Sequence, residues 1–138
     1  MIGILIIAHG TLGESLIHCA SHVLNKRPPR LRQLGVTAQD DPLLLLPQAR
    51  ALVKELDDGD GVLILSDIYG ASPCNLVCKL GVPDRIEAVA GVNLPMLIRA
   101  LTYRERDLAT VVTKAVSGGC DGVVRIPTLS VHNAATGS

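Results

Sequence analysis

Two polar side chains directly follow apolar segments that have the composition of buried strands. His9 comes after residues 2–8, an unbroken apolar run, and Asp67 comes after the run at 61–65 and one serine. One ring nitrogen of a histidine can attack a labile group while a partner holds the other nitrogen. A carboxylate that accepts the N–H of one nitrogen fixes the tautomer and exposes the lone pair of the other. These residue types predict that His9 carries a labile group near neutral pH and that Asp67 orients its ring.

The chain around these two residues offers backbone donors for an anion. Thr11 and Glu14 have the spacing of a capping box, which predicts a helix that opens at Thr11, next to His9. The Ser72-Pro73 pair predicts a second helix start with Ser72 as its cap, and an ordinary structural cap is the alternative interpretation. Unpaired N–H groups and the helix dipole favour an anion at such ends. The predicted phosphate-binding residues are Gly10, Thr11, Gly70, Ala71 and Ser72.

Three further residues on the first predicted helix have metal-ligand chemistry. Glu14, His18 and His22 stand about one turn apart, but they face away from the apolar stripe of that helix, which favours a solvated face over a metal site. His132 falls in a polar tail and is assigned no role. We therefore predict neither a metal nor a cofactor.

The cysteines form no Cys-x-x-Cys pair, which argues against a redox motif or a zinc site. We interpret them as reduced, buried thiols of a cytosolic protein, and two of them, four residues apart, as small core residues. They are Cys19, Cys74, Cys78 and Cys120.

The composition limits the classes of partner. The 138 residues suit one domain, and 13 basic and 13 acidic side chains give a formal net charge of zero. The balance of charges indicates neither a nucleic-acid nor a membrane-surface partner. An aromatic content of 1% also argues against a surface on which nucleic-acid bases stack. The apolar N-terminus is shorter than the roughly 20 residues that span a bilayer, and it lacks the basic lead-in of a signal peptide. We therefore expect a cytoplasmic location without membrane insertion.

Short apolar runs alternate with segments of helical periodicity, which predicts an α/β sandwich with a mainly parallel sheet. Ligands bind such sheets beyond the carboxyl ends of the strands. We expect the loops that hold His9, Asp67 and residues 91–93 to converge at that edge. The predicted strands are residues 2–8, 31–36, 61–65, 86–90 and 122–126.

Capping residues predict where the other helices begin. Asp41 is placed to cap a helix, but Pro47 conflicts with an unbroken one, so we expect a kink or a start delayed to Pro47. Asn93 is expected to open another helix. Asp107 is expected to cap the last helix, which should end at the glycines 118–119.

Three segments of the chain resemble the IIA component of the mannose family of the phosphoenolpyruvate-dependent sugar phosphotransferase system (EIIA-Man type). The middle segment, Asp-x-x-Gly-x-Ser-Pro-x-Asn, is the most specific of the three. With a matching order of strands and helices, the resemblance covers residues 1–127 and leaves 128–138 as a polar tail, expected to be disordered. The segments are residues 6–10 (Ile-Ile-Ala-His-Gly), 67–75 (Asp-Ile-Tyr-Gly-Ala-Ser-Pro-Cys-Asn) and 90–97 (Ala-Gly-Val-Asn-Leu-Pro-Met-Leu).

The resemblance implies that His9 is the phosphorylated residue, with the phosphocarrier protein HPr as donor, Asp67 as its hydrogen-bonding partner and Ser72 in the phosphate-binding rim. It implies a three-layer sandwich whose last strand, 122–126, lies antiparallel at a sheet edge, and a homodimer in which that strand joins the partner's sheet. No Pro/Ala-rich linker and IIB domain follow in this sequence. The acceptor is therefore expected to be a separate IIB protein, or the chain to bind a regulatory target.

Other functions were weighed against this one. The phosphoryl-donor subunit of a phosphotransferase-dependent dihydroxyacetone kinase has a similar first domain. A non-catalytic partner-binding module would use His9 and Asp67 only as a satisfied polar pair. A response-regulator receiver is disfavoured, because it needs an acidic pair after the first strand to hold Mg²⁺, where this chain has Ala8 and His9.

Overall fold

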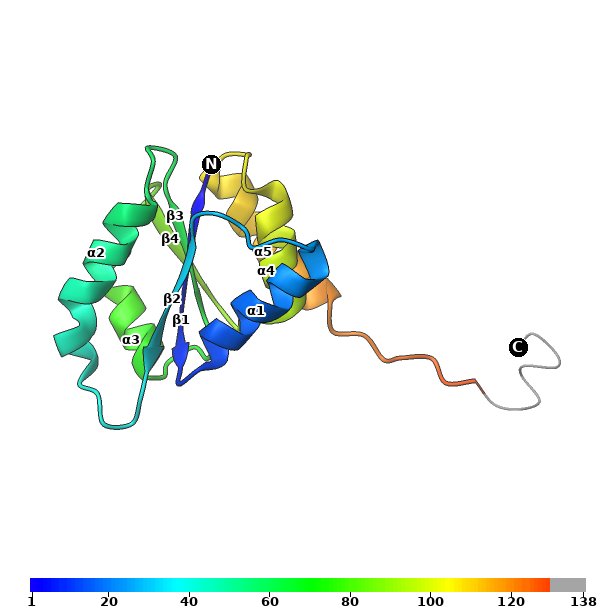
Figure 1. Ribbon diagram of the computed structural model, residues 1–138, viewed down its shortest axis with the longest axis horizontal. Helices are drawn as coiled ribbons and strands as arrows, with labels where there is room; N and C mark the ends of the chain where they lie inside the picture. Colours follow the sequence, from blue (N-terminus) through cyan, green and yellow to red (C-terminus); the bar gives the residue numbers. More distant parts are fainter. Residues whose placement is uncertain (130–138) are drawn as a thin grey trace.

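The computed structural model describes residues 1–129, which form a parallel sheet covered by helices on both faces (Figure 1). In chain order the elements are β1 (Gly3–His9), α1 (Leu12–Leu24), β2 (Leu31–Val36), the 3₁₀ helix η1 (Pro42–Leu45), α2 (Leu46–Leu56), β3 (Val62–Ser66), α3 (Ser72–Cys78), β4 (Ile86–Ala90), α4 (Leu94–Tyr103) and α5 (Leu108–Asp121). Helices α2 and α3 cover one face of the sheet, and α1, α4 and α5 cover the other. The predicted three layers are thus present.

The strand order β2-β1-β3-β4 places β1 in the interior of the sheet. Successive residues of β1 point to opposite faces, so Ile4 and Ile6 join the core beneath α1, α4 and α5, while Leu5 and Ile7 join the core beneath α2 and α3. A strand covered on both faces needs apolar residues at every position, which is why the N-terminal run shows no alternation. Each such side chain contributes roughly 1.5–3 kcal/mol to stability.

The first four predicted strands are confirmed to within one or two residues, and the α/β class with a parallel sheet is confirmed. The predicted antiparallel C-terminal edge strand is wrong. Residues 122–126 have no regular strand structure, and the paired strands within residues 1–129 are all parallel, apart from an isolated antiparallel bridge between Val82 and Ile86. The chain leaves α5 pointing away from the sheet, so its backbone groups meet no strand of this copy (Figure 1).

Two of the predicted helix starts are confirmed in atomic detail. Asp41 accepts a hydrogen bond of 3.0 Å from the Leu43 N–H and opens η1. The conflict at Pro47 is resolved because η1 ends at Leu45 and α2 begins at Leu46, so Pro47 lies in the first turn of α2. An N–H group in the first turn has no helical acceptor, so the N–H that proline lacks removes no helical hydrogen bond. Asn93 accepts a 2.9 Å bond from the Met96 N–H at the start of α4.

Helix α5 starts after Asp107 as predicted, although the Asp107 side chain makes no capping hydrogen bond. The helix continues two residues beyond the glycines at which it was expected to end. Gly118 and Gly119 are buried against α4. A β-carbon at Gly118 would lie 2.7 Å from Arg99 Cβ, and one at Gly119 would lie 2.7 Å from Met96 Cε. These glycines therefore allow α4 and α5 to pack closely and do not end the helix.

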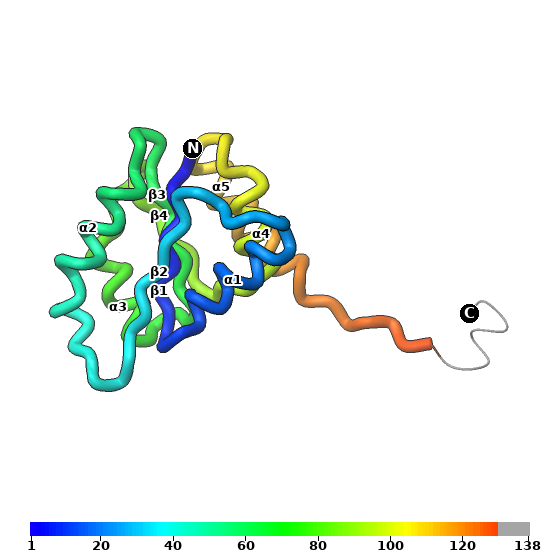
Figure 2. Tube along the Cα trace, in the orientation of Figure 1, coloured from blue at the N-terminus to red at the C-terminus, as the bar shows by residue number. Residues whose placement is uncertain are grey.

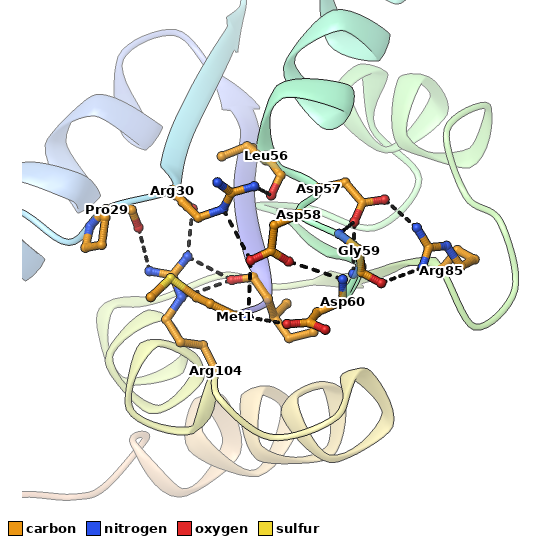
Figure 3. Close-up of polar contacts among 12 residues, drawn as sticks. Met1, Pro29, Arg30, Leu56, Asp57, Asp58, Gly59, Asp60, Arg85 and Arg104 are labelled. Carbon is orange, nitrogen blue, oxygen red and sulfur yellow. Dashed lines mark hydrogen bonds and ion pairs between the residues drawn. The ribbon is translucent and has the colours of Figure 1, made fainter.

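A buried arginine joins the chain segments at the end of the sheet opposite His9 (Figure 3). Arg104 is only 5% exposed. Its guanidinium donates to the carbonyls of Ile2 (3.0 and 2.8 Å), Pro29 (2.6 Å) and Arg30 (2.7 Å). Burial away from water lowers the pKa of Arg104 to about 10, so the group still carries its charge at neutral pH. One side chain therefore holds the start of β1, the entry to β2 and the end of α4 together.

Replacing this guanidinium should weaken the fold. Arg104→Met is expected to lower the free energy of unfolding by about 2–4 kcal/mol, because the buried carbonyl of Ile2 and the partly buried carbonyls of Pro29 and Arg30 each lose a donor. Arg104→Lys should recover only part of the loss, since an ammonium cannot reach carbonyls in a fork geometry. Urea denaturation measures both, with Arg106→Met as the exposed control. An Arg104→Met midpoint equal to that of Arg106→Met would contradict this role.

Candidate functional site

The register of the parallel sheet brings His9 and Asp67 together. His9 is the last residue of β1 and lies opposite Val36 of β2. On the other side of β1, Ile7 lies opposite Ser66, so the next residue of that chain segment, Asp67, emerges beside the end of β1. Residues 58 positions apart in sequence thus share the carboxyl edge of the sheet.

Asp67 contacts His9 through both the imidazole and the backbone. Its Oδ2 lies 2.7 Å from His9 Nδ1 and also accepts the His9 backbone N–H at 3.0 Å. Its other oxygen, Oδ1, accepts the Ile68 N–H at 2.9 Å. The Asp67 side chain is 9% exposed, whereas the His9 side chain is 50% exposed. The carboxylate is therefore held rigidly, while the far side of the imidazole faces solvent.

The pKa of Asp67 reports the balance of these contacts. Burial acts to raise it, but the hydrogen bonds from the His9 N–H, the His9 ring and the Ile68 N–H outweigh burial, so the pKa of Asp67 lies below its ordinary value of 3.8. Asp67 is therefore ionised at neutral pH and can only accept hydrogen bonds. The proton of the imidazole is drawn to Nδ1, which leaves the lone pair of Nε2 on the exposed side of the ring.

This lowered pKa predicts how acid affects stability. A carboxyl group whose pKa is lower in the folded state stabilises the fold above its unfolded pKa, and that contribution disappears as the pH falls through the folded value. The stability difference between wild type and Asp67→Asn should therefore be full above about pH 5 and should shrink below about pH 4. Urea denaturation at a series of pH values measures it. A difference that stays constant or grows with acid would contradict the assignment.

Two glycines of the predicted rim adopt backbone conformations that other residues rarely reach. Gly10 has a φ of +53° and Gly70 a φ of +83°. Gly10 turns the chain from β1 toward α1, and its N–H donates to the Val36 carbonyl at 2.9 Å. Gly70 lies in the loop between Asp67 and α3. Both loops therefore stay short and keep their backbone close to His9.

The predicted caps at this edge are wrong in detail. Thr11 precedes α1, but its side chain makes no capping hydrogen bond, so the expected capping box with Glu14 does not form. Ala71, not Ser72, is the cap residue of α3, and Ser72 is already the first helical residue. The reason is local backbone geometry, since Ala71 carries the extended φ and ψ of a cap residue. Thr11 and Ser72 are both exposed at the edge that holds His9.

The third loop, residues 91–93, also reaches this edge. The Val92 N–H donates to the Ser66 carbonyl at 2.9 Å, directly beside Asp67. The Asn93 side chain is occupied elsewhere, because its Nδ2 donates to the Gly119 carbonyl and its Oδ1 caps α4. This loop therefore supports the end of β3, and the polar groups nearest His9 come from the other two loops.

Sequence reasoning missed the backbone donors that hold Asp67 and the apolar residues beside it. The N–H groups of His9 and Ile68 have no side-chain signature, so only the register and the turn reveal them. Ile68 and Tyr69, in contrast, are visible in the sequence as bulky apolar residues within a polar loop, and they are 59% and 84% exposed.

The remaining candidates lie away from His9 or lack a partner. Glu14, His18 and His22 are exposed on α1, and within residues 1–129 no group of three His, Cys, Asp or Glu side chains is arranged to hold a metal ion. His132 lies outside the described residues, as do residues 130–138 of the expected disordered tail. No helix among residues 1–129 has both the length and the apolar character needed to cross a membrane.

The prediction of buried thiols is right for Cys74 alone. Cys19, Cys78 and Cys120 are exposed. Each of these three lies on a helix whose apolar stripe is formed by other residues, so the cysteine occupies an outward position. Cys78 also ends α3, where the helix reaches the surface.

A comparison with protein families identifies the family to which the chain belongs. The profile of the EIIA-man family, described as "PTS system fructose IIA component", matches residues 3–116. The chain therefore belongs to the IIA family of the phosphotransferase system.

Two curated proteins illustrate the sequence similarity. The mannose-specific EIIAB component of Escherichia coli K12 is 31% identical over 137 residues, which cover 97% of this chain and 42% of that protein. The fructose-specific EIIA component of Bacillus subtilis is 39% identical over 54 residues, which cover 38% of this chain and 37% of that protein. The chain thus spans less than half the length of the Escherichia coli protein, and the match to the Bacillus subtilis protein covers only part of each chain.

Solved structures show the same fold. The mannose/sorbose specific IIA subunit from Enterococcus faecalis aligns with a TM-score of 0.82 at 21% identity, over 94% of this chain and 98% of that chain. The EIIA component from Streptococcus agalactiae aligns with a TM-score of 0.80 at 22% identity, over 91% of this chain and 97% of that chain. The chain therefore shares its fold with these two solved IIA proteins.

Proposed function

We propose that this chain is a phosphoryl carrier of the sugar phosphotransferase system and that His9 Nε2 is the atom that becomes phosphorylated. One observation carries the proposal. The ionised Asp67, 2.7 Å from Nδ1, holds the proton there and leaves Nε2 as a free nucleophile on a half-exposed ring. Membership of the IIA family supports the same conclusion.

The chemistry is a displacement at phosphorus. The Nε2 lone pair forms the new N–P bond as the bond between phosphorus and the donor nitrogen breaks, and the electron pair of that bond returns to the donor ring. The imidazole of His9 then carries positive charge, which Asp67 stabilises through Nδ1–H. Little covalent assistance is needed, so the contribution of the protein is position and charge. The exposed hydroxyls of Thr11 and Ser72, with the backbone N–H groups of both turns, are the groups proposed to bind the phosphoryl oxygens.

The partners follow from this role. HPr is the proposed donor, and a IIB component or a regulatory protein is the proposed acceptor or target. The similarity to a protein named EIIAB favours a IIB acceptor. The sheet described here has two edge strands, β2 and β4, and the proposed homodimer is an association of two copies through one of these edges. The proposed location is the cytoplasm, where these partners act.

The direct test is to follow intact mass after incubation with phosphoenolpyruvate, enzyme I and HPr. We expect a gain of one phosphoryl group that is labile to acid and stable to alkali, and that maps to the peptide containing His9. Omission of HPr is the control and should remove the gain. If HPr becomes phosphorylated in the same tube and this chain does not, the carrier proposal is wrong, and a partner-binding module becomes the leading explanation.

A further inference from the structure

One asparagine side chain forms hydrogen bonds with two helix ends that lie next to each other. Asn93 Oδ1 accepts the Met96 N–H at 2.9 Å and caps the start of α4. Its Nδ2 donates to the Gly119 carbonyl at 3.2 Å, in the last turn of α5. The last four carbonyls of a helix have no partner within the helix, so the amide supplies the donor that Gly119 lacks. A side chain that makes both bonds must carry an acceptor and a donor on separate atoms, as an amide does.

The packing of α4 against α5 brings these groups within reach. The two helices lie side by side on one face of the sheet (Figure 2). Gly118 and Gly119 allow their close approach, and a β-carbon at Gly122, directly after α5, would lie 2.4 Å from Pro95 Cβ. The loop 91–93 is therefore held where the start of α4 meets the end of α5.

The same loop contacts the strand end that carries Asp67. The Val92 N–H, one residue before Asn93, donates to the Ser66 carbonyl at 2.9 Å. That carbonyl belongs to the peptide unit that joins Ser66 to Asp67, and a peptide unit is planar. The Ser66 hydroxyl adds no second restraint, because it is buried and has no hydrogen-bond partner among the described residues. The bond from Val92 therefore limits rotation of the peptide unit from which Asp67 extends.

We propose that Asn93 is a positioning residue for phosphoryl transfer at His9. It holds the loop 91–93 against Ser66. The Asp67 carboxylate thereby stays in the place from which it fixes the tautomer of the His9 ring. The kinetic part of this proposal rests on the proposed function, whereas the effect on the tautomer does not.

The link from position to chemistry is the hydrogen bond between the two reacting partners. Asp67 Oδ2 lies 2.7 Å from His9 Nδ1, and a hydrogen bond weakens steeply as its angle departs from linearity. A displaced carboxylate holds the proton on Nδ1 less firmly. The tautomer with the proton on Nε2 then gains population, and in that tautomer Nε2 has no free lone pair to attack phosphorus.

The test uses two variants that separate the cap of α4 from the bond to α5. Asn93→Ser keeps an acceptor for the start of α4, but its shorter side chain loses the donor to the Gly119 carbonyl. Asn93→Ala loses both bonds. The readouts are the nitrogen NMR signals of the His9 ring, which report the tautomer, and the rate of transfer from purified phospho-HPr.

We expect Asn93→Ser to populate the Nε2–H tautomer of His9 measurably. Its transfer rate at saturation should be about tenfold below that of wild type with KM for phospho-HPr unchanged, because a misplaced group costs rate and not binding. Asn93→Ala should show the same rate loss and should also unfold at a lower urea concentration, since it lacks the cap.

Arg104→Met is the matched control for a weaker fold, because it removes hydrogen bonds at the opposite end of the sheet. It should keep the tautomer and the transfer rate of wild type under conditions in which it is folded. If Asn93→Ser also keeps both, Asn93 is only a cap and the proposal is wrong. An equal loss in Arg104→Met, or a rise in KM at unchanged saturating rate in Asn93→Ser, would also overturn it. If wild type accepts nothing from phospho-HPr, the proposed function fails, and the His9 tautomer alone decides whether Asn93 positions Asp67.

Discussion

His9→Ala is expected to accept no phosphoryl group from phospho-HPr, as measured by intact mass after full phosphorylation of the donor. The variant lacks the only imidazole of the described residues that is held by a carboxylate. The expected loss is complete, because no other group at this edge offers a free nitrogen lone pair oriented by Asp67. The fold should persist, since the His9 side chain is 50% exposed and contributes little to either core.

The control for this result is another exposed histidine. His18→Ala removes an imidazole from the outer face of α1 and should gain one phosphoryl group at the rate of wild type. Equal urea midpoints for the two variants would show that a missing signal in His9→Ala is chemical. A full phosphoryl gain in His9→Ala would place the acceptor elsewhere and contradict the assignment.

Asp67→Asn is expected to slow phosphoryl transfer to His9 by about 10²–10⁴-fold while leaving the binding of phospho-HPr nearly unchanged. An amide cannot stabilise the charge that develops on the imidazole, and it no longer forces the ring proton onto Nδ1. Rapid-quench measurement of transfer at several HPr concentrations separates the rate at saturation from KM. The loss should appear in the rate, because the carboxylate acts on the transition state.

The control for the loss of one negative charge is a substitution at another acidic residue. Glu55→Gln removes an exposed carboxylate that pairs with Arg32 at 2.8 Å, far from His9 in the chain. It should transfer at the wild-type rate. A tenfold or smaller loss in Asp67→Asn, or an equal loss in Glu55→Gln, would mean that Asp67 supports the structure and does not orient the reacting ring.

Local chemistry in the sequence was enough to predict that His9 and Asp67 lie at one edge of the sheet, and to predict most helices and strands. The apolar run before His9 and the one before Asp67 were predicted to be buried strands, and parallel strands bring their carboxyl ends to one edge. Asp41 and Asn93 were predicted to begin helices from their residue type, and the hydrogen bonds that confirm this reach backbone N–H groups only two and three residues away. Interactions this short in range depend little on the rest of the fold.

Other features depended on the backbone conformation of the folded chain and on contacts between distant segments. Gly118 and Gly119 were predicted to end a helix, but the close approach of α4 makes them packing residues. Ser72 was predicted to cap α3, and the backbone of the preceding loop shifts the cap to Ala71. Residues 122–126 have the composition of a strand, but a strand requires a neighbouring edge, and the path of the chain after α5 provides none in this copy.

The sequence by itself determined the residue that can react, the carboxylate that can orient it and the α/β class, because these follow from residue type and periodicity along the chain. Only the tertiary structure decided that Asp67 holds the His9 ring through Nδ1, that the pKa of this carboxyl is lowered, and that Asn93 joins the ends of α4 and α5. Those properties arise from the register between strands and from the contacts between helices, and both are set when segments far apart in the sequence pack together.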